Sequence, residues 1–169
     1  MSSQEASGGK FLPVFFVDEV KEGAQFQAGE WPLHMTLFPP LETSYDAPLG
    51  KAIRYFVNPV EPFNAVVGKS DIFGTQEMID SGKGVFVRKI EENPSLRKVH
   101  GGLVQALAHL RHNPTFRTPY NPHVSMDPAD QRLQSGSEIW VEGMSLVTRE
   151  PGAKVWEVVD KMRFKGEAR

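Results

Sequence analysis

The chain has 169 residues, 40% of them hydrophobic and 24% charged, which is the composition of one globular domain and excludes a disordered or fibrous protein. Its net charge of −2 argues against tight, sequence-independent binding to long nucleic acids, because such binding needs many contacts between cations and phosphates. The chain has no cysteine, so neither disulfides nor thiolate metal sites contribute.

No apolar run is long enough to span a membrane, and residues 1–10 lack the apolar core of a signal peptide. We therefore expect a cytoplasmic monomer without membrane contact, in which residues 1–10 form a disordered N-terminus. Residues 11–169 are expected to form a single domain.

The first two predicted elements are strands. Phe11–Val17 is rich in phenylalanine and valine, which suit a buried strand, and the polar segment Asp18–Glu30 is predicted to be a loop. Leu33–Phe38 is the second strand. Pro39–Pro40 ends it, because proline gives no donor to a sheet.

The middle of the chain predicts a helix and two more strands. Asp46 is a suitable cap for a helix that runs to about Val57 and has one apolar face. Phe63–Val67 and Gly84–Ile90 have the pattern of strands. The polar connection Ser70–Lys83 between them contains a candidate short strand at Ile72–Phe73.

The clearest helix pattern in the sequence runs over Pro94–Arg111, with Asn93 as its cap. The segment Asn113–Pro122 is broken by prolines and is predicted to be a loop. Ile139–Thr148 and Lys154–Phe164 are predicted to be two strands of a closing hairpin. This order of elements predicts an α+β fold with mostly antiparallel sheets.

Two short segments, His34–Leu37 and His123–Met126, repeat the pattern histidine, any residue, hydroxyl residue, apolar residue. In a strand, side chains two residues apart point to the same face, so each histidine lies beside a hydroxyl group. An imidazole titrates near neutral pH, and a hydroxyl group can hold an oxygen of a phosphate or carbonyl group. Two such pairs suffice for acid–base chemistry on a phosphate ester. The residues alone leave the alternative that both histidines are structural.

The two segments resemble the His-x-Thr/Ser-apolar signature of the 2H phosphoesterase superfamily. This superfamily includes bacterial 2′-5′ RNA ligase-like proteins and RNA 2′,3′-cyclic phosphodiesterases. The family pattern carries over to four positions, His34, Thr36, His123 and Ser125. The sequence departs from the commoner family pattern in its second hydroxyl residue, which is serine, and in the absence of an arginine after Met126.

The resemblance implies two similar lobes whose mostly antiparallel sheets face a central groove, with helices on the outside. It implies a phosphoesterase that needs neither metal nor cofactor and hydrolyses 2′,3′-cyclic phosphate ends of RNA or nucleotides to a 2′-phosphomonoester. The resemblance leaves open whether this chain also has 2′-5′ RNA ligase activity. By this resemblance His34 is the general acid, His123 the general base, and Thr36 and Ser125 bind the phosphate. The alternative is a catalytically idle module of the same fold that binds RNA or nucleotides.

Further residues are candidates for contacts with a substrate. Phe38 and Tyr120 lie next to the two segments and are candidates to stack on a base. Asp127 either orients a histidine or begins a turn with Pro128. The basic candidates for phosphate or ribose contacts are Lys69, Lys83, Arg88, Arg117 and Arg132.

The remaining histidines are assigned no catalytic role. His109 and His112 have a spacing that metal ligands use, but no third ligand lies near them in the sequence, so no metal site is expected. His100 borders the apolar face of its helix and is expected to be structural.

Overall fold

The structure is a computed structural model that describes residues 9–112 and 120–166. In chain order its elements are β1 (Lys10–Phe16), β2 (Gln25–Gln27), β3 (His34–Thr36), α2 (Ala47–Val57), β4 (Phe63–Phe73), α3 (Gln76–Asp80), β5 (Val85–Ile90), α4 (Pro94–Leu107), β6 (His123–Ser125), β7 (Glu138–Val141), β8 (Gly143–Arg149) and β9 (Val155–Arg163). β1 thus begins at Lys10, and most of the predicted loop Asn113–Pro122 lies outside the described residues.

All nine strands belong to one sheet with the order β2-β9-β8-β1-β3-β6-β5-β4-β7. Every strand pair in it is antiparallel. The sheet has two halves, β2-β9-β8-β1-β3 and β6-β5-β4-β7, and the two motif strands β3 and β6 meet where the halves join. The predicted α+β fold with mostly antiparallel strands is therefore confirmed.

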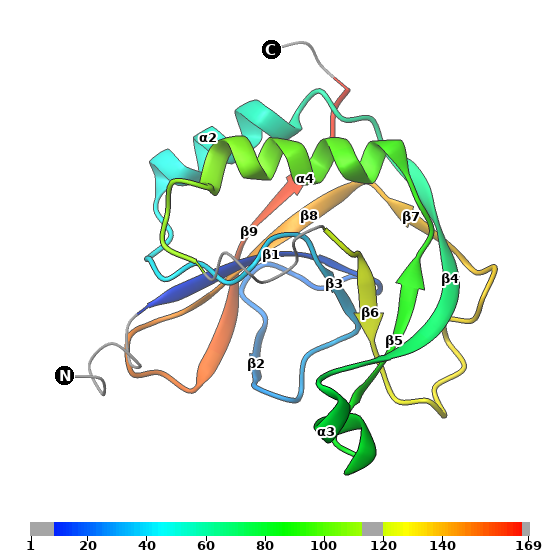
Figure 1. The fold of residues 1–169 in the computed structure, drawn as a ribbon. Helices are drawn as coiled ribbons and strands as arrows, with labels where there is room; N and C mark the ends of the chain where they lie inside the picture. The colour runs from blue at the N-terminus through cyan, green and yellow to red at the C-terminus, as the bar shows by residue number, and fades with distance from the viewer. Residues whose placement is uncertain (1–8, 113–119, 167–169) are drawn as a thin grey trace.

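Helices α2 and α4 cover one side of the sheet, and β2 and α3 project on the other side (Figure 1). Both helices begin as the sequence predicts. The Asp46 side chain accepts a hydrogen bond from the Leu49 amide at 3.0 Å, and the Asn93 side chain accepts bonds from Ser95 and Leu96. α4 ends at Leu107, four residues before the predicted end, and no helix in the described part of the chain is long and apolar enough to cross a membrane.

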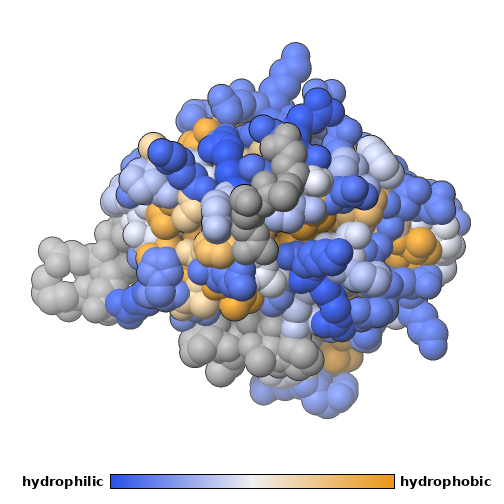
Figure 2. Space-filling model, turned by 90° about the horizontal axis from the view of Figure 1, so that it is seen from above, coloured by the Kyte–Doolittle hydropathy of each residue, from blue (hydrophilic) through white to orange (hydrophobic). Residues whose placement is uncertain are grey.

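The two faces of the sheet are covered differently. The helix side carries the main core, which includes Met35 and Val124 of the motif strands, both 0% exposed. Seen from the helix side, the surface is mostly hydrophilic, with hydrophobic residues showing in patches near its centre (Figure 2). The other face carries a smaller apolar cluster around Val14 and Phe16. The motif residues that alternate with Met35 and Val124 point to this second face.

The segment Asp18–Glu30, predicted to be a loop, contains the short edge strand β2, which pairs with β9. Of its three residues only Phe26 is partly buried, so the strand has too little apolar alternation to be recognised in the sequence. The predicted strand Phe63–Val67 extends to Phe73 as β4. A register shift between Val67 and Ser70 interrupts its alternation, which explains why the sequence suggested two separate strands.

Two further differences concern short elements. The predicted polar connection after β4 contains the helix α3, which is capped by Thr75 and has no buried residue. The predicted strand Ile139–Thr148 is two strands, because the chain turns at Glu142 from β7, which pairs with β4, to β8, which pairs with β1 and β9. Just after this turn Gly143 permits β8 to approach β9 closely, since a Cβ there would collide with the carbonyl oxygen of Met162. The predicted hairpin of the last two strands is present as β8 and β9.

A polar contact links the helix layer to the sheet. The Tyr45 hydroxyl donates to Asp160 Oδ2 at 2.6 Å, and Arg54 Nη2 donates to Asp160 Oδ1 at 2.7 Å. The Asp160 side chain is 14% exposed, so its charge needs both partners. Burial, and then the hydrogen bond to Asp160, raises the pKa of Tyr45 above its ordinary value of about 10.

We predict that Asp160→Ala lowers the free energy of unfolding by roughly 2–4 kcal/mol, and Tyr45→Phe by about 1 kcal/mol, in urea denaturation. In the folded protein the Tyr45 phenol stays neutral, whereas in the unfolded chain it ionises near its ordinary pKa of about 10. The free energy of unfolding of the wild type should therefore also fall as pH rises above about 10. Tyr45→Phe should reduce that fall.

The control for this prediction is Glu42→Ala, which removes an exposed ion pair with Arg111. Its effect should stay within about 1 kcal/mol, because exposed ion pairs contribute little. An Asp160→Ala effect as small as this control would show that the contact does not hold the helix layer to the sheet.

Candidate active site

The two motif strands are direct neighbours, and their register brings the four motif side chains together. Met35 of β3 lies opposite Val124 of β6. Because the strands are antiparallel, His34 lies opposite Ser125, and Thr36 lies opposite His123. All four side chains are on the face of the sheet that the helices do not cover.

In this arrangement each histidine is opposite the hydroxyl residue of the other motif. Directly opposite residues have Cβ atoms about 4.5–5.5 Å apart, and diagonal ones, such as His34 and His123 here, about 7–8 Å. One phosphate group with its hydrogen bonds fills a diagonal of this size. The residues that the sequence placed as two separate pairs thus form one square on adjacent strands.

Both imidazole rings are oriented by a backbone carbonyl two residues earlier in the chain. His34 Nδ1 lies 2.9 Å from the carbonyl oxygen of Pro32, and His123 Nδ1 lies 2.8 Å from that of Asn121. A carbonyl oxygen only accepts, so Nδ1 carries the proton and the neutral ring has its lone pair on Nε2. In this tautomer Nε2 is the ring nitrogen of each histidine that can accept a proton.

The same local bond occurs at His112, whose Nδ1 lies 2.7 Å from the carbonyl oxygen of Leu110. The ring of His112 packs against Phe38, with centroids 5.2 Å apart, and has no place in the square. The bond alone therefore does not identify a site. The shared face and the cross-strand register distinguish His34 and His123 from His112.

Aromatic rings surround His34. The ring of Trp31 lies 4.8 Å from the His34 ring and that of Phe16 lies 6.1 Å away, measured between centroids. Trp31 is held in turn by Phe26 at 5.0 Å and Trp156 at 5.2 Å. The contact between Trp31 and His34 was not predicted from the sequence. The position of Trp31, three residues before a candidate catalytic histidine, is a signal from which it could have been predicted.

His123 has an aromatic neighbour in Phe73, whose ring lies 4.6 Å from the imidazole in an edge-to-face arrangement. Phe73 ends β4 and pairs with Val85 at the tip of the β4–β5 hairpin. The contact between Phe73 and His123 joins segments 50 residues apart, so no local pattern in the sequence could reveal it.

The two predicted stacking residues, Phe38 and Tyr120, both pack against other side chains of the protein. Phe38 is 3% exposed and packs in the main core, because the chain beyond β3 turns its side chain toward the helices. Tyr120 stacks on His100, with centroids 4.1 Å apart and planes 3° apart, and its hydroxyl donates to the Thr36 carbonyl at 3.1 Å. Burial, and then the charge of Arg97, lowers the pKa of His100, which is structural as predicted. The Tyr120 hydroxyl therefore supports β3, and one face of its ring is covered by His100.

Of the predicted basic residues in the described part of the chain, none lies in the square. Arg88 lies opposite Val124 and so points to the other face, and Arg132 is engaged by Asp130 and Asp18. Arg117 lies outside the described residues. The cation that the register places beside the site is Lys89, which lies directly opposite His123 on β5 and was missed.

The Asp127 side chain accepts from the Ala129 amide at 2.8 Å, which is the contact of a residue that begins a turn. Within residues 9–112 and 120–166, no group of three or more histidine, aspartate or glutamate residues could hold a metal ion.

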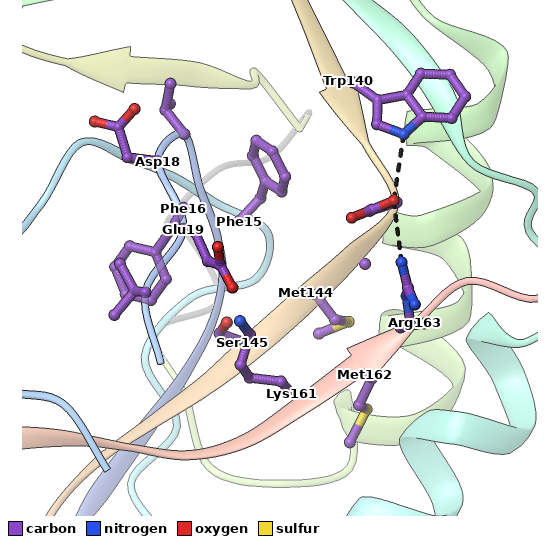
Figure 3. A pocket seen from close by; sticks show the side chains of 14 residues that line it. Phe15, Phe16, Asp18, Glu19, Trp140, Met144, Ser145, Lys161, Met162 and Arg163 are labelled. Carbon is purple, nitrogen blue, oxygen red and sulfur yellow. Dashed lines mark hydrogen bonds and ion pairs between the residues drawn. The ribbon is translucent and has the colours of Figure 1, made fainter. Parts of the chain in front are cut away.

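A cavity of about 550 Å³ is lined by residues at the end of β1 and around the start of β8 and the end of β9 (Figure 3). None of the four motif residues lines it, although Phe16, which contacts His34, does. Glu142 accepts from Trp140 Nε1 at 3.4 Å and pairs with Arg163 at 3.3 Å across it. Three carboxylates against two cations do not select for a phosphate group, so this cavity does not compete with the square as a phosphate site. These charged lining residues are Asp18, Glu19, Glu142, Lys161 and Arg163.

Comparisons with solved structures find proteins that share this fold. A crystal structure described as a phosphoesterase matches with 12% identity and a TM-score of 0.53, covering 93% of this chain and 98% of that chain. LigT of E. coli complexed with NADP+ matches with 12% identity and a TM-score of 0.54, covering 93% and 98%. The complex of LigT with 3′-AMP matches with 12% identity and a TM-score of 0.51, covering 92% of this chain and 98% of that chain. At such identities the likeness shows a shared fold alone.

A search of curated protein sequences gives no match. A family model does match, over residues 13–141, and its description is the 2′-5′ RNA ligase superfamily. The matched range is most of the chain and contains both motifs, and the structural neighbours share the fold, so the resemblance to the 2H phosphoesterase superfamily is confirmed. The chain belongs to the 2′-5′ RNA ligase superfamily.

Proposed function

We propose that this protein is a phosphodiesterase that opens 2′,3′-cyclic phosphate ends of RNA or nucleotides and leaves a 2′-phosphomonoester. The observation that carries the proposal is the square of two histidines and two hydroxyl residues on adjacent strands. The proposal is supported by the family and by solved neighbours of the same fold, which include LigT complexed with 3′-AMP and with phosphate.

The reaction needs a base for water, an acid for the departing 3′-oxygen and donors for the phosphoryl oxygens. In our proposal His123 Nε2 takes the proton from water, and the water oxygen forms a bond to phosphorus. The bond from phosphorus to the 3′-oxygen breaks, and His34, in its charged form, gives that oxygen a proton. The diagonal placement of the two rings suits this division, because the attacking and departing oxygens lie on opposite sides of phosphorus.

Thr36 and Ser125 occupy the other diagonal, and in our proposal their hydroxyl groups donate hydrogen bonds to the two remaining phosphoryl oxygens. Lys89, opposite His123, adds a positive charge on that side of the phosphate. With a 5′-hydroxyl group in place of water, the same step joins two RNA ends through a 2′-5′ bond. In the reverse of that step the two histidines exchange roles.

The first test is turnover itself. We expect hydrolysis of the four nucleoside 2′,3′-cyclic phosphates, and of an RNA that ends in a cyclic phosphate, with EDTA present, because imidazoles do the work that a metal-bound hydroxide would otherwise do. Product phosphorylated at the 2′ position is measured by NMR or chromatography. Loss of activity in EDTA that a divalent ion restores would exclude this mechanism, and binding without turnover would favour an idle module.

The second test removes the proton donors and acceptors. His34→Ala and His123→Ala should each lower kcat by roughly 10² to 10⁴, and the double variant should be little worse than either single one. The rate of the wild type should pass through a maximum with pH, since one ring must be charged and the other neutral. His109→Ala, which changes an exposed histidine outside the square, is the control and should keep the wild-type rate. If either motif histidine behaved like His109, the two-histidine mechanism would be wrong.

The third test addresses the hydroxyl groups. Thr36→Val and Ser125→Ala each remove one contact to the phosphate and leave the proton-transfer groups in place. We expect kcat/KM to fall by roughly 5- to 150-fold, equivalent to about 1–3 kcal/mol, with both limbs of the pH profile retained. Wild-type kcat/KM in both variants would show that the phosphate is held elsewhere.

A further inference from the structure

Each histidine of the square has an aromatic neighbour that comes from a different half of the sheet. Trp31 precedes β3 and contacts His34 at 4.8 Å, whereas Phe73 ends β4 and contacts His123 at 4.6 Å. The square thus has one aromatic ring on the side of each imidazole, at opposite ends of the same diagonal.

Trp31 is a rigid, partly exposed surface. Its ring is held at centroid distances of 5.0 Å by Phe26 and 5.2 Å by Trp156, and the guanidinium of Arg149 lies over Trp156 at 5.5 Å. A ring held in this way loses little further conformational freedom when a ligand stacks on it. Trp31 nevertheless retains exposure on the substrate side of the sheet, where the helices provide no cover.

Phe73 has a different support. It lies at the tip of the β4–β5 hairpin, is partly exposed and meets the ring of His123 in an edge-to-face arrangement. An edge-to-face contact covers at most one face of either ring. The other face of Phe73 can therefore stack on a base while the contact with His123 is kept.

Proteins that bind single-stranded RNA stack the exposed bases on aromatic side chains, and the stack tolerates all four bases. We propose that Trp31 and Phe73 form two nucleobase-stacking subsites, one on each side of the reacting phosphate. This inference rests on the proposed function and adds which part of the substrate each ring contacts.

The assignment of the subsites follows from the proton transfers. The departing 3′-oxygen, next to His34, belongs to the nucleoside that carries the cyclic phosphate, so its base lies on the side of Trp31. The attacking oxygen, next to His123, is either water or the 5′-oxygen of a second nucleoside, whose base lies on the side of Phe73. Trp31 therefore stacks on a base of every nucleotide substrate, whereas Phe73 stacks on a base only when a second nucleoside is present.

The experiment uses Trp31→Leu, Trp31→Phe and Phe73→Leu with three substrates. These are adenosine 2′,3′-cyclic phosphate, the base-free methyl riboside 2′,3′-cyclic phosphate, and 2′-5′-linked diadenosine. In cleavage of the dinucleotide the 3′-hydroxyl forms a bond to phosphorus and gives up its proton, the bond to the 5′-oxygen breaks, and that oxygen takes a proton. The products are adenosine 2′,3′-cyclic phosphate and adenosine.

We expect Trp31→Leu to raise KM for the cyclic nucleotide and the dinucleotide by roughly 5- to 150-fold and to leave KM for the base-free ester within about twofold of wild type. Trp31→Phe should retain most of the affinity. Phe73→Leu should raise KM for the dinucleotide alone. Trp140→Leu, which changes a tryptophan that is 54% exposed on β7, is the matched control and should alter none of these values.

Equal losses on the base-free ester and the nucleotides would overturn the inference, because Trp31 would then only position His34. An effect of Phe73→Leu on the cyclic nucleotide equal to its effect on the dinucleotide would overturn the assignment of sides. If the wild type turns over none of the substrates, the proposed function fails, and calorimetric binding of 2′-AMP and of methyl riboside 2-phosphate tests the stacking. A Trp31-dependent preference for 2′-AMP would support it, and equal binding of the two would overturn it.

Discussion

The pairing of β3 with β6 is the contact on which the rest of the structure depends. It joins the two halves of the sheet, and it does so through the single register pair Met35 and Val124. Since side chains alternate along a strand, a slip of one residue in β6 would move His123 and Ser125 into the core and Val124 out of it. The burial of Met35 and Val124, both 0% exposed, thus fixes the polar side chains on the other face.

Because of this constraint, the residues that stabilise the motif strands are different from the residues that form the candidate site. The helix side of the sheet has a continuous core, whereas the site side has only a small apolar cluster around Phe16. The motif strands need one apolar position each to stay in register, and that leaves the flanking positions to polar residues. The reaction proposed above requires this, because its imidazoles and hydroxyl groups must be in place before the substrate arrives.

Much of the fold could be predicted because the signals are local. Both long helices begin at capping residues, Asp46 and Asn93, whose bonds to the first turn of each helix are visible in the sequence as residue types. Strands β1 and β9 have clear apolar patterns. The elements that were missed, β2 and α3, are short and mostly exposed, so they have no pattern to recognise. The break between β7 and β8 depends on different partners for the two strands, which is long-range information.

The same division applies to the candidate site. Its four motif residues were predicted from two tetrapeptides, but their cross-strand square was not, since register between strands 89 residues apart is set by the core. Phe38 and Tyr120 were chosen for sequence proximity to the motifs, yet one lies in the core and the other supports the Thr36 carbonyl. Phe73 and Lys89 reach His123 from β4 and β5. The side chains around the four motif residues come from strands that are neighbours in the sheet. Their identity therefore depends on the order of the strands and not on nearness in the sequence.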